Sequence, residues 1–133
     1  MMYFDSNIFV YALIYDHQLE DFKKADYYLQ RIVKAEIIGY TSTLTWDEVF
    51  YVIKKNNDLD KAIQASNVFL KLPNLCFINV DFSVILEAHN IIRESGIMPR
   101  DAIHAACAIK YCNGNIVSND NCFDNINKMK RIY

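Results

Sequence analysis

The sequence predicts a three-layer α/β/α sandwich with a mainly parallel central sheet, and two observations support this prediction. Short apolar runs alternate with longer segments that carry apolar residues at helical spacing, along the whole chain. Such alternation is typical of a sheet whose strands are joined by helices packed on both faces. In addition, 53% of the 133 residues are hydrophobic and only 2 are proline and 3 glycine, which favours a single compact domain over residues 1–133.

Residues 2–40 predict a strand, a helix and a second strand. Residues 2–5 form an apolar run of strand length, and residues 37–40 form another. Between them, apolar residues recur every three or four positions, which indicates an amphipathic helix over residues 19–35. The residues that define its apolar face are Phe22, Ala25, Leu29, Ile32 and Val33.

Two further helices are expected before the middle of the chain. The first begins near Leu44, and its apolar face is expected to lie against the core. The residues of that face are Trp46, Val49, Phe50 and Ile53. The second covers residues 59–70 and ends before Pro73, because the residue that precedes a proline disfavours the helical conformation.

The remaining residues predict two helices and three strands. Asp81 or Ser83 is suited to cap the first of these helices, and Gly96 is suited to end it. Residues 100–111 are almost wholly apolar and therefore indicate a buried helix. The expected strands are residues 75–80, residues 116–117 and, at the edge of the sheet, residues 131–133.

Charge and composition exclude several classes of protein. The net charge of −2 excludes a strongly basic nucleic-acid binder, although basic pairs such as Lys23–Lys24 and Lys54–Lys55 could contact phosphates. No apolar run approaches the roughly 18 residues of a membrane span, and the N-terminus lacks the pattern of a signal peptide. We therefore expect a cytoplasmic protein with no membrane partner. The 4 cysteines form no C-x-x-C pair, so reduced thiols are expected rather than a zinc site.

Four acidic residues lie where predicted elements begin or end, or face a cleft. Asp5 closes the first strand and Asp120 follows residues 116–117. Asp101 lies in the first turn of a helix, and Glu48 lies on a partly covered helix face. Carboxylates that converge repel one another and lose hydration, so a hard divalent metal ion is the expected compensation.

Three of the four acids also have a purely structural interpretation. Asp5 could form a turn, Asp101 could be favoured by the helix dipole, and Asp120 could cap a short helix. Asp47 lies next to Glu48 but points about 100° away by helix geometry, so it is the weaker candidate.

Neighbouring polar residues could support the acids. Asn7 could hold the Asp5 carboxylate, and Ser118 offers a hydroxyl near Asp120. Asp124 lies one helical turn beyond Asp120 and is either an outer ligand or a surface residue. His104 is interpreted as a hydrogen-bonded packing residue and not as part of the catalytic set. Two aromatic residues that could stack on bases or pack in the core are Tyr11 and Tyr15.

Taken together, these segments resemble the PIN-domain nucleases, in particular the small VapC-type toxins of prokaryotic toxin–antitoxin pairs. The stretches that carry the resemblance are residues 3–8, 41–49, 99–106 and 116–120 with Phe123, in the order of the family. The residues that correspond by position to the family's acidic quartet are Asp5, Glu48, Asp101 and Asp120. Asn7 and Ser118 correspond to its polar supporting positions, where Ser118 replaces a frequent threonine and keeps the hydroxyl.

The resemblance implies a PIN-like fold, Mg²⁺ or Mn²⁺ as cofactor, cleavage of RNA, a homodimer and an antitoxin partner. Asp5, Asp101 and Asp120 are then the expected metal ligands, direct or through water, and Glu48 completes the shell or positions the water. The alternative is a non-catalytic module of the same fold that binds RNA or protein, although such a module has little need of four repelling carboxylates. A phosphoacceptor domain and a D-x-D phosphatase fit less well, because Asp5 has no acidic neighbour and Asn7 occupies the second acidic position.

Overall fold

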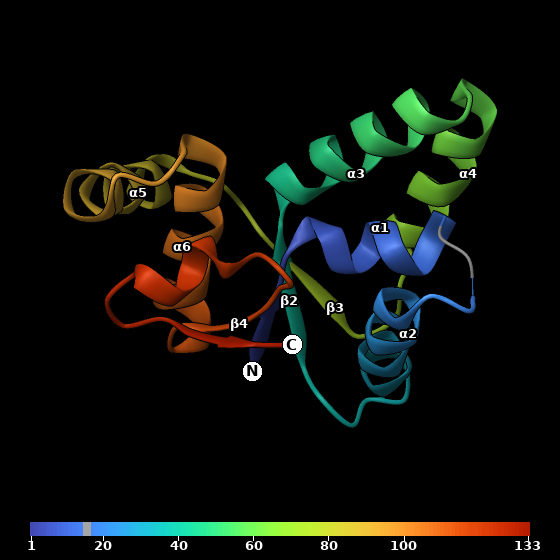
Figure 1. The fold of residues 1–133 in the computed structure, drawn as a ribbon, viewed down its shortest axis with the longest axis horizontal. Helices are drawn as coiled ribbons and strands as arrows, with labels where there is room; N and C mark the ends of the chain where they lie inside the picture. The colour runs from blue at the N-terminus through green and yellow to red at the C-terminus, as the bar shows by residue number, and fades with distance from the viewer. Residues whose placement is uncertain (15–16) are drawn as a thin grey trace.

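A parallel five-stranded sheet forms the centre of the protein, as the computed structural model of residues 1–14 and 17–133 shows (Figure 1). The order of the strands is β3-β2-β1-β4-β5, and each neighbouring pair within the described residues is parallel. The strands are β1 (Met2–Phe4), β2 (Gly39–Ser42), β3 (Leu75–Ile78), β4 (Asn115–Val117) and β5 (Lys130–Ile132). The predicted α/β/α class is therefore confirmed, with a sheet that is parallel throughout.

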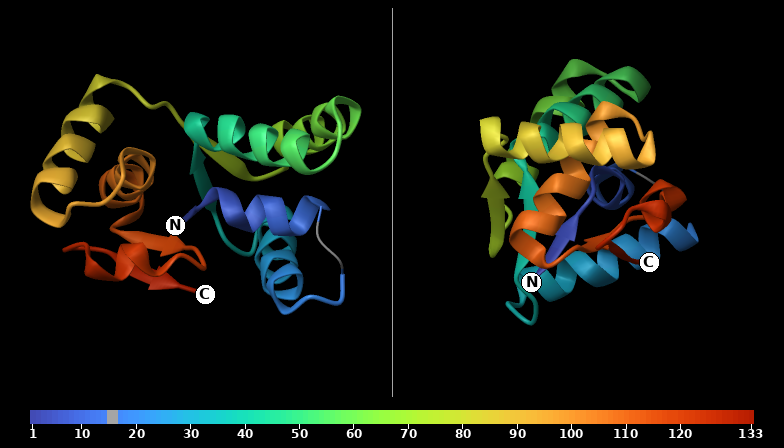
Figure 2. Two further views of the ribbon diagram at one scale, coloured as in Figure 1. Left: turned by 45° about the horizontal axis from the view of Figure 1, so that its top comes forward. Right: turned by 90° about the vertical axis from the view of Figure 1, so that its left-hand side faces the viewer.

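The helices cover both faces of this sheet. They are α1 (Ser6–Ile14), α2 (Glu20–Val33), α3 (Thr43–Asn56), α4 (Leu59–Leu70), α5 (Phe82–Ser95), α6 (Pro99–Cys112) and a short 3-10 helix, η1 (Asn121–Asn125). Figure 1 and Figure 2 show α5 and α6 on one side of the sheet and α1 to α4 on the other. None of the helices in the described part of the chain is long and apolar enough to cross a membrane.

Adjacent residues of the short central strands supply two separate cores. Tyr3 of β1 and Ile116 of β4 are fully buried against α5 and α6. Phe4 and Val117, the next residues of the same strands, are fully buried on the opposite face, in the core formed with helices α1 to α4. Successive side chains of a strand point to opposite faces, so an uninterrupted apolar run is what a sheet covered on both sides requires.

The expected apolar face of α3 is only partly correct. Val49 and Ile53 are buried, but Trp46 is 40% exposed and Thr45 takes the inward position instead. The indole nitrogen of Trp46 donates a hydrogen bond to Ser66 Oγ of α4 at 2.8 Å, which places the ring at the junction of two helices at the surface. Helical spacing alone does not tell whether Thr45 or Trp46 faces the core, because a helix that packs on both a sheet and a second helix has a wide apolar face.

Helix ends follow the predicted signals. Asp81, and not Ser83, is the N-cap of α5, and its carboxylate accepts a hydrogen bond from Val84 N at 3.0 Å. Gly96 ends the same helix in the left-handed conformation with φ of 71°. The second strand starts later than predicted, at Gly39, where a side chain would collide with Ile32, since a Cβ would lie 2.7 Å from Ile32 Cδ1.

Gly114 is required between α6 and β4, and replacing it by alanine is expected to destabilise the protein. Its φ is +78°, and an added Cβ would lie 1.8 Å from the carbonyl oxygen of Lys128. We expect Gly114→Ala to lower the free energy of unfolding by about 2 kcal/mol or more, through backbone strain and steric overlap together. Urea denaturation followed by circular dichroism measures this change.

Gly96→Ala is the matched control for this prediction. Gly96 has a similar φ of +71°, but nothing lies within 4 Å of its added Cβ, so only the backbone strain applies. An equal loss of stability in the two variants would contradict the steric part of the argument.

Candidate active site

The carboxyl ends of three neighbouring strands position the candidate site. Asp5 directly follows β1, Glu48 lies in α3, which starts directly after β2, and Asp120 follows β4 after two residues. Because β1 lies between β2 and β4, these ends are adjacent at one edge of the sheet. Asp101 joins them from the first turn of α6, a helix that contacts all three strands.

Asp5 is held rigidly at the centre of this edge. Its side chain is almost fully buried, with 6% of the residue exposed. One carboxylate oxygen accepts a hydrogen bond from Ser6 N at 2.7 Å, and the other accepts one from Ser118 Oγ at 2.7 Å. The Ser118 hydroxyl also accepts a hydrogen bond from Asp120 N at 3.0 Å, so a single hydroxyl connects Asp5 to the loop that carries Asp120.

Asn7 cross-links the ends of β1 and β4. Its amide nitrogen donates to Asp5 Oδ2 at 3.3 Å and to Ser118 Oγ at 3.2 Å, and it also contacts Asn119 Oδ1. These partners are acceptors, which determines that the amide nitrogen faces them. Asn7 Oδ1 is buried and has no hydrogen-bond partner within the described part of the chain.

Glu48 is paired with His104, which the sequence interpretation left out of the catalytic set. His104 has no exposed surface, and its Nε2 atom contacts Glu48 Oε1 and lies 3.6 Å from Asp5 Oδ1. Burial by itself lowers the pKa of His104, but the nearby carboxylates of Asp5 and Glu48 outweigh it and raise the pKa overall. His104 follows Asp101 by one turn within an alanine-rich buried helix, and this is the sequence signal that identifies it. A polar side chain on such a face needs a polar partner.

Asp101 and Asp120 form the second half of the site, together with Cys122. One ligand atom from each of the three residues lies within 4.8 Å of the others. Burial raises the pKa of Asp101, and the carboxylates of Asp120 and Asp5 raise it further. Burial and the carboxylate of Asp101 likewise raise the pKa of the Cys122 thiol.

Asp124 lies with Arg131 and not with the four acids. Its carboxylate accepts hydrogen bonds from Arg131 Nε at 2.7 Å and from Arg131 Nη2 at 2.9 Å. Arg131 in turn donates from Nη1 to the carbonyl oxygen of Ser118 at 3.1 Å. Within the described residues, Asp124 is thus linked to the site through the arginine that holds the Ser118 backbone.

The ligand set of this site fits a hard divalent cation. The carboxylate oxygens of Asp101 and Asp120 lie close together, and Mg²⁺ and Mn²⁺ prefer such oxygen ligands. Asp5 lies near this pair, since in addition to burial its charge, like that of Asp120, raises the pKa of Asp101.

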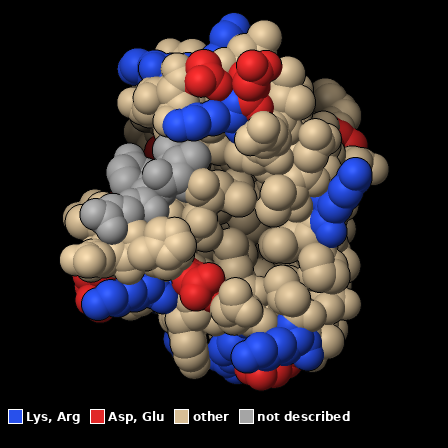
Figure 3. All heavy atoms as spheres, turned by 90° about the vertical axis from the view of Figure 1, so that its right-hand side faces the viewer, with Lys and Arg blue, Asp and Glu red and all other residues tan. Residues whose placement is uncertain are grey.

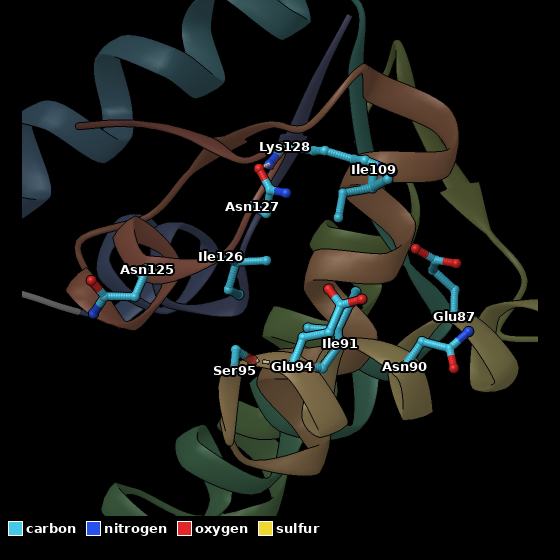
Figure 4. Close-up of a pocket in the computed structure, with 10 residues that line it drawn as sticks. All are labelled: Glu87, Asn90, Ile91, Glu94, Ser95, Ile109, Asn125, Ile126, Asn127 and Lys128. Carbon is cyan, nitrogen blue, oxygen red and sulfur yellow. Dashed lines mark hydrogen bonds between the residues drawn. The ribbon is translucent and has the colours of Figure 1, made fainter.

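A separate hollow lies beside the opposite end of α6. It has a volume of about 340 Å³ and is bordered by α5, α6 and the segment that follows η1 (Figure 4). Ile109 of α6 lines it, eight residues or about 12 Å along the helix from Asp101. None of the four acids lines this hollow, so it is not the candidate site.

Comparisons with known proteins identify the family. A model of the PIN domain family matches residues 2–129. A comparison with curated protein sequences gives no match. A toxin–antitoxin complex from Klebsiella pneumoniae is similar in structure, with 19% identity, a TM-score of 0.64, and coverage of 91% of this chain and 88% of that chain.

Two further solved structures have the same fold. VapC20 of Mycobacterium tuberculosis, described as a sarcin–ricin loop cleaving toxin, has 14% identity, covers 93% of each chain and gives a TM-score of 0.72. VapBC2 of Rickettsia felis, bound to a DNA fragment from its promoter, has 20% identity, covers 99% of this chain and 98% of that chain, and gives a TM-score of 0.74. These identities establish a common fold, and the family model covers all the segments that carry the four acids. The chain belongs to the PIN domain family.

Proposed function

We propose that the chain is a Mg²⁺- or Mn²⁺-dependent endoribonuclease and the toxin of a toxin–antitoxin pair. One observation carries the proposal: carboxylates from four separate elements meet at the carboxyl edge of a parallel sheet, where ligands of such sheets bind. Membership of the PIN domain family supports the same activity. We further propose that residues 1–133 act as one domain in the cytoplasm.

The proposed reaction is hydrolysis of an RNA phosphodiester bond. A divalent cation at this site supplies Lewis acidity, lowers the pKa of the attacking water and neutralises charge on the phosphoryl oxygens. Asp5, held by Ser118 and Asn7, and the pair Asp101 and Asp120 bind the ion. Glu48 would orient the attacking water. Its oxygen would form a bond to phosphorus as the P–O bond to the departing strand breaks, and one proton of the water would pass through solvent to the departing oxygen.

Aromatic and basic groups near the same edge are suited to contact the rest of the RNA. The phenol oxygen of Tyr11 accepts a hydrogen bond from Asn119, next to the acidic site. Tyr133 follows β5, and Lys24 Nζ lies 4.6 Å from the centre of its ring. Rings stack on unpaired bases and lysines bind phosphates, so this arrangement supports a single-stranded substrate. Tyr15, the other proposed stacking residue, lies outside the described residues.

The rival proposal is a non-catalytic module of the same fold that binds RNA or a protein. Binding alone gives no reason to keep four repelling carboxylates in one cluster, where burial and then the carboxylates of Asp120 and Asp5 raise the pKa of Asp101. The acidic cluster therefore favours catalysis over binding.

Exposed apolar surface supports a protein partner, which we propose to be an antitoxin. Val68 and Leu70 of α4 are 55% and 51% exposed, and Trp46 of α3 is 40% exposed. Figure 3 shows a broad uncharged area between charged groups at the top and bottom of the face that includes α1, α2 and α4. The structurally similar proteins include toxin–antitoxin complexes. The antitoxin is tested by co-purification with the product of an adjacent small reading frame and by inhibition of cleavage by that product.

We also propose that the protein forms a homodimer. Sedimentation of the purified protein tests this proposal.

A cleavage assay tests the proposed activity. Total RNA incubated with the purified protein and Mg²⁺ or Mn²⁺ should be cut at defined positions, and a chelator should abolish the cutting. Asp47→Asn is the matched control for substitutions in the site, because Asp47 is exposed on the same helix as Glu48 and should leave cleavage unchanged. RNA that binds to the protein with no metal-dependent cleavage would favour the non-catalytic module.

A further inference from the structure

His104 connects two buried side chains through both of its ring nitrogens. Nδ1 lies 2.6 Å from the hydroxyl of Tyr3, and Nε2 contacts Glu48 Oε1. His104 and Tyr3 have no exposed surface, whereas the Glu48 side chain is 16% exposed. The buried chain Tyr3–His104–Glu48 therefore ends at the solvent-accessible site.

The hydrogen-bonding capacities of the groups determine the direction of this chain. The Glu48 carboxylate can only accept, so Nε2 of His104 carries the proton and donates it. The Tyr3 hydroxyl lies at hydrogen-bond distance from Nδ1, on the other side of the ring. Thr45 lies one helical turn before Glu48, and its hydroxyl is bonded to Thr41 Oγ1 at 2.7 Å, so the base of α3 is fixed to β2 as well.

We propose that His104 is a positioning residue that holds one carboxylate oxygen of Glu48, Oε1, and so leaves Oε2 as the oxygen that faces the metal ion or its water. This inference rests on the proposed nuclease function. Without His104, Glu48 would keep the rotational freedom of a glutamate side chain, and only a fraction of its conformations would present an oxygen to the site. Asp5 Oδ1, at 3.6 Å from the same nitrogen, places His104 between two of the four acids.

Groups that hydrogen-bond to metal-binding side chains have a known scale of effect. Removing such a group typically lowers metal affinity or activity by about 10- to 100-fold. His104→Leu should therefore lower both kcat and Mn²⁺ affinity by about this factor. His104→Gln keeps an N–H donor near the position of Nε2, so we expect it to recover a substantial part of both. Tyr3→Phe removes only the hydroxyl behind the imidazole, and we expect the same direction with a smaller effect.

The decisive test is a double-mutant cycle with Glu48→Gln. If His104 acts through Glu48, adding His104→Leu to Glu48→Gln should cause less than about a twofold further loss in kcat and in Mn²⁺ affinity measured by titration calorimetry. A merely structural role would lower both in the same proportion whether or not Glu48 is present. His89→Gln is the control, because His89 is exposed on α5 and the chemical change matches His104→Gln.

The outcomes separate this inference from the proposed function. If His104→Leu lowers kcat and Mn²⁺ affinity as much in the Glu48→Gln background as in the wild type, the positioning role is overturned. Unchanged kcat and Mn²⁺ affinity in folded His104→Leu and Tyr3→Phe proteins would overturn it as well. Absence of cleavage by the wild-type protein in the presence of metal would reject the nuclease function instead. In that case the Mn²⁺-affinity cycle still decides whether His104 positions Glu48.

Discussion

Asp5→Asn is expected to reduce the rate of RNA cleavage by about 10²- to 10³-fold. The loss of a metal ligand removes several kcal/mol of transition-state stabilisation, and each 1.36 kcal/mol corresponds to a tenfold change in rate. The fold should be retained. The asparagine oxygen can still accept the hydrogen bond from Ser6 N. The new amide nitrogen takes the place of Oδ2 and loses the hydrogen bonds that Oδ2 accepts from Ser118 Oγ and Asn7 Nδ2, which should lower the stability by about 1 to 3 kcal/mol without unfolding the protein. The change therefore removes a negative charge and one oxygen ligand without opening a cavity.

The measurement compares single-turnover cleavage of one defined RNA by the wild-type protein, Asp5→Asn and Asp47→Asn. Thermal denaturation of each protein, followed by circular dichroism, shows whether the fold is kept. A folded Asp5→Asn protein that cleaves at the wild-type rate would remove Asp5 from the mechanism. A loss of cleavage in Asp47→Asn as well would point to a general effect of surface charge.

Much of the fold was predictable because apolar spacing and helix-end residues agree. The apolar runs at Tyr3 and Ile116 correspond to central strands covered on both faces, and Gly96 marks the end of a helix, as its left-handed conformation confirms. The position of Trp46 was not predictable, because its partial exposure depends on a hydrogen bond to Ser66, 20 residues away. Such pairings depend on how helices pack on each other, which local periodicity does not record.

The candidate site was predictable to the extent that its residues lie at element ends. Asp5 and Asp120 follow strands, and the order of parallel strands brings them together. His104 was left out, because an isolated histidine on an apolar helix usually serves packing, and its partners Tyr3 and Glu48 are distant in sequence. Asp124 lies one turn beyond Asp120, and spacing alone does not reveal that Arg131 binds its carboxylate.

Mn²⁺ is expected to raise the melting temperature of the wild-type protein, and Asp101→Asn should remove most of this increase. A ligand at 100 times its Kd stabilises the fold by about 2.7 kcal/mol, which corresponds to a shift of several degrees for a chain of this size. Asp101 is expected to be a ligand, since its carboxylate lies with that of Asp120. Without metal, Asp101→Asn should instead be more stable than the wild type, because it removes a repelled, partly buried charge.

The pH dependence gives this prediction a second test. Folding raises the pKa of Asp101 above its ordinary value of 3.8. The ionised carboxylate therefore lowers the free energy of unfolding by its full amount at pH values above the raised pKa, and this loss is absent at pH values below 3.8. The advantage of metal-free Asp101→Asn over the wild type should therefore be present at neutral pH and disappear as the pH falls through this window. Denaturation curves across this pH range, with and without Mn²⁺, measure both effects, and Asp47→Asn serves as the control. Equal Mn²⁺ shifts in Asp101→Asn and the wild type would show that Asp101 does not hold the ion.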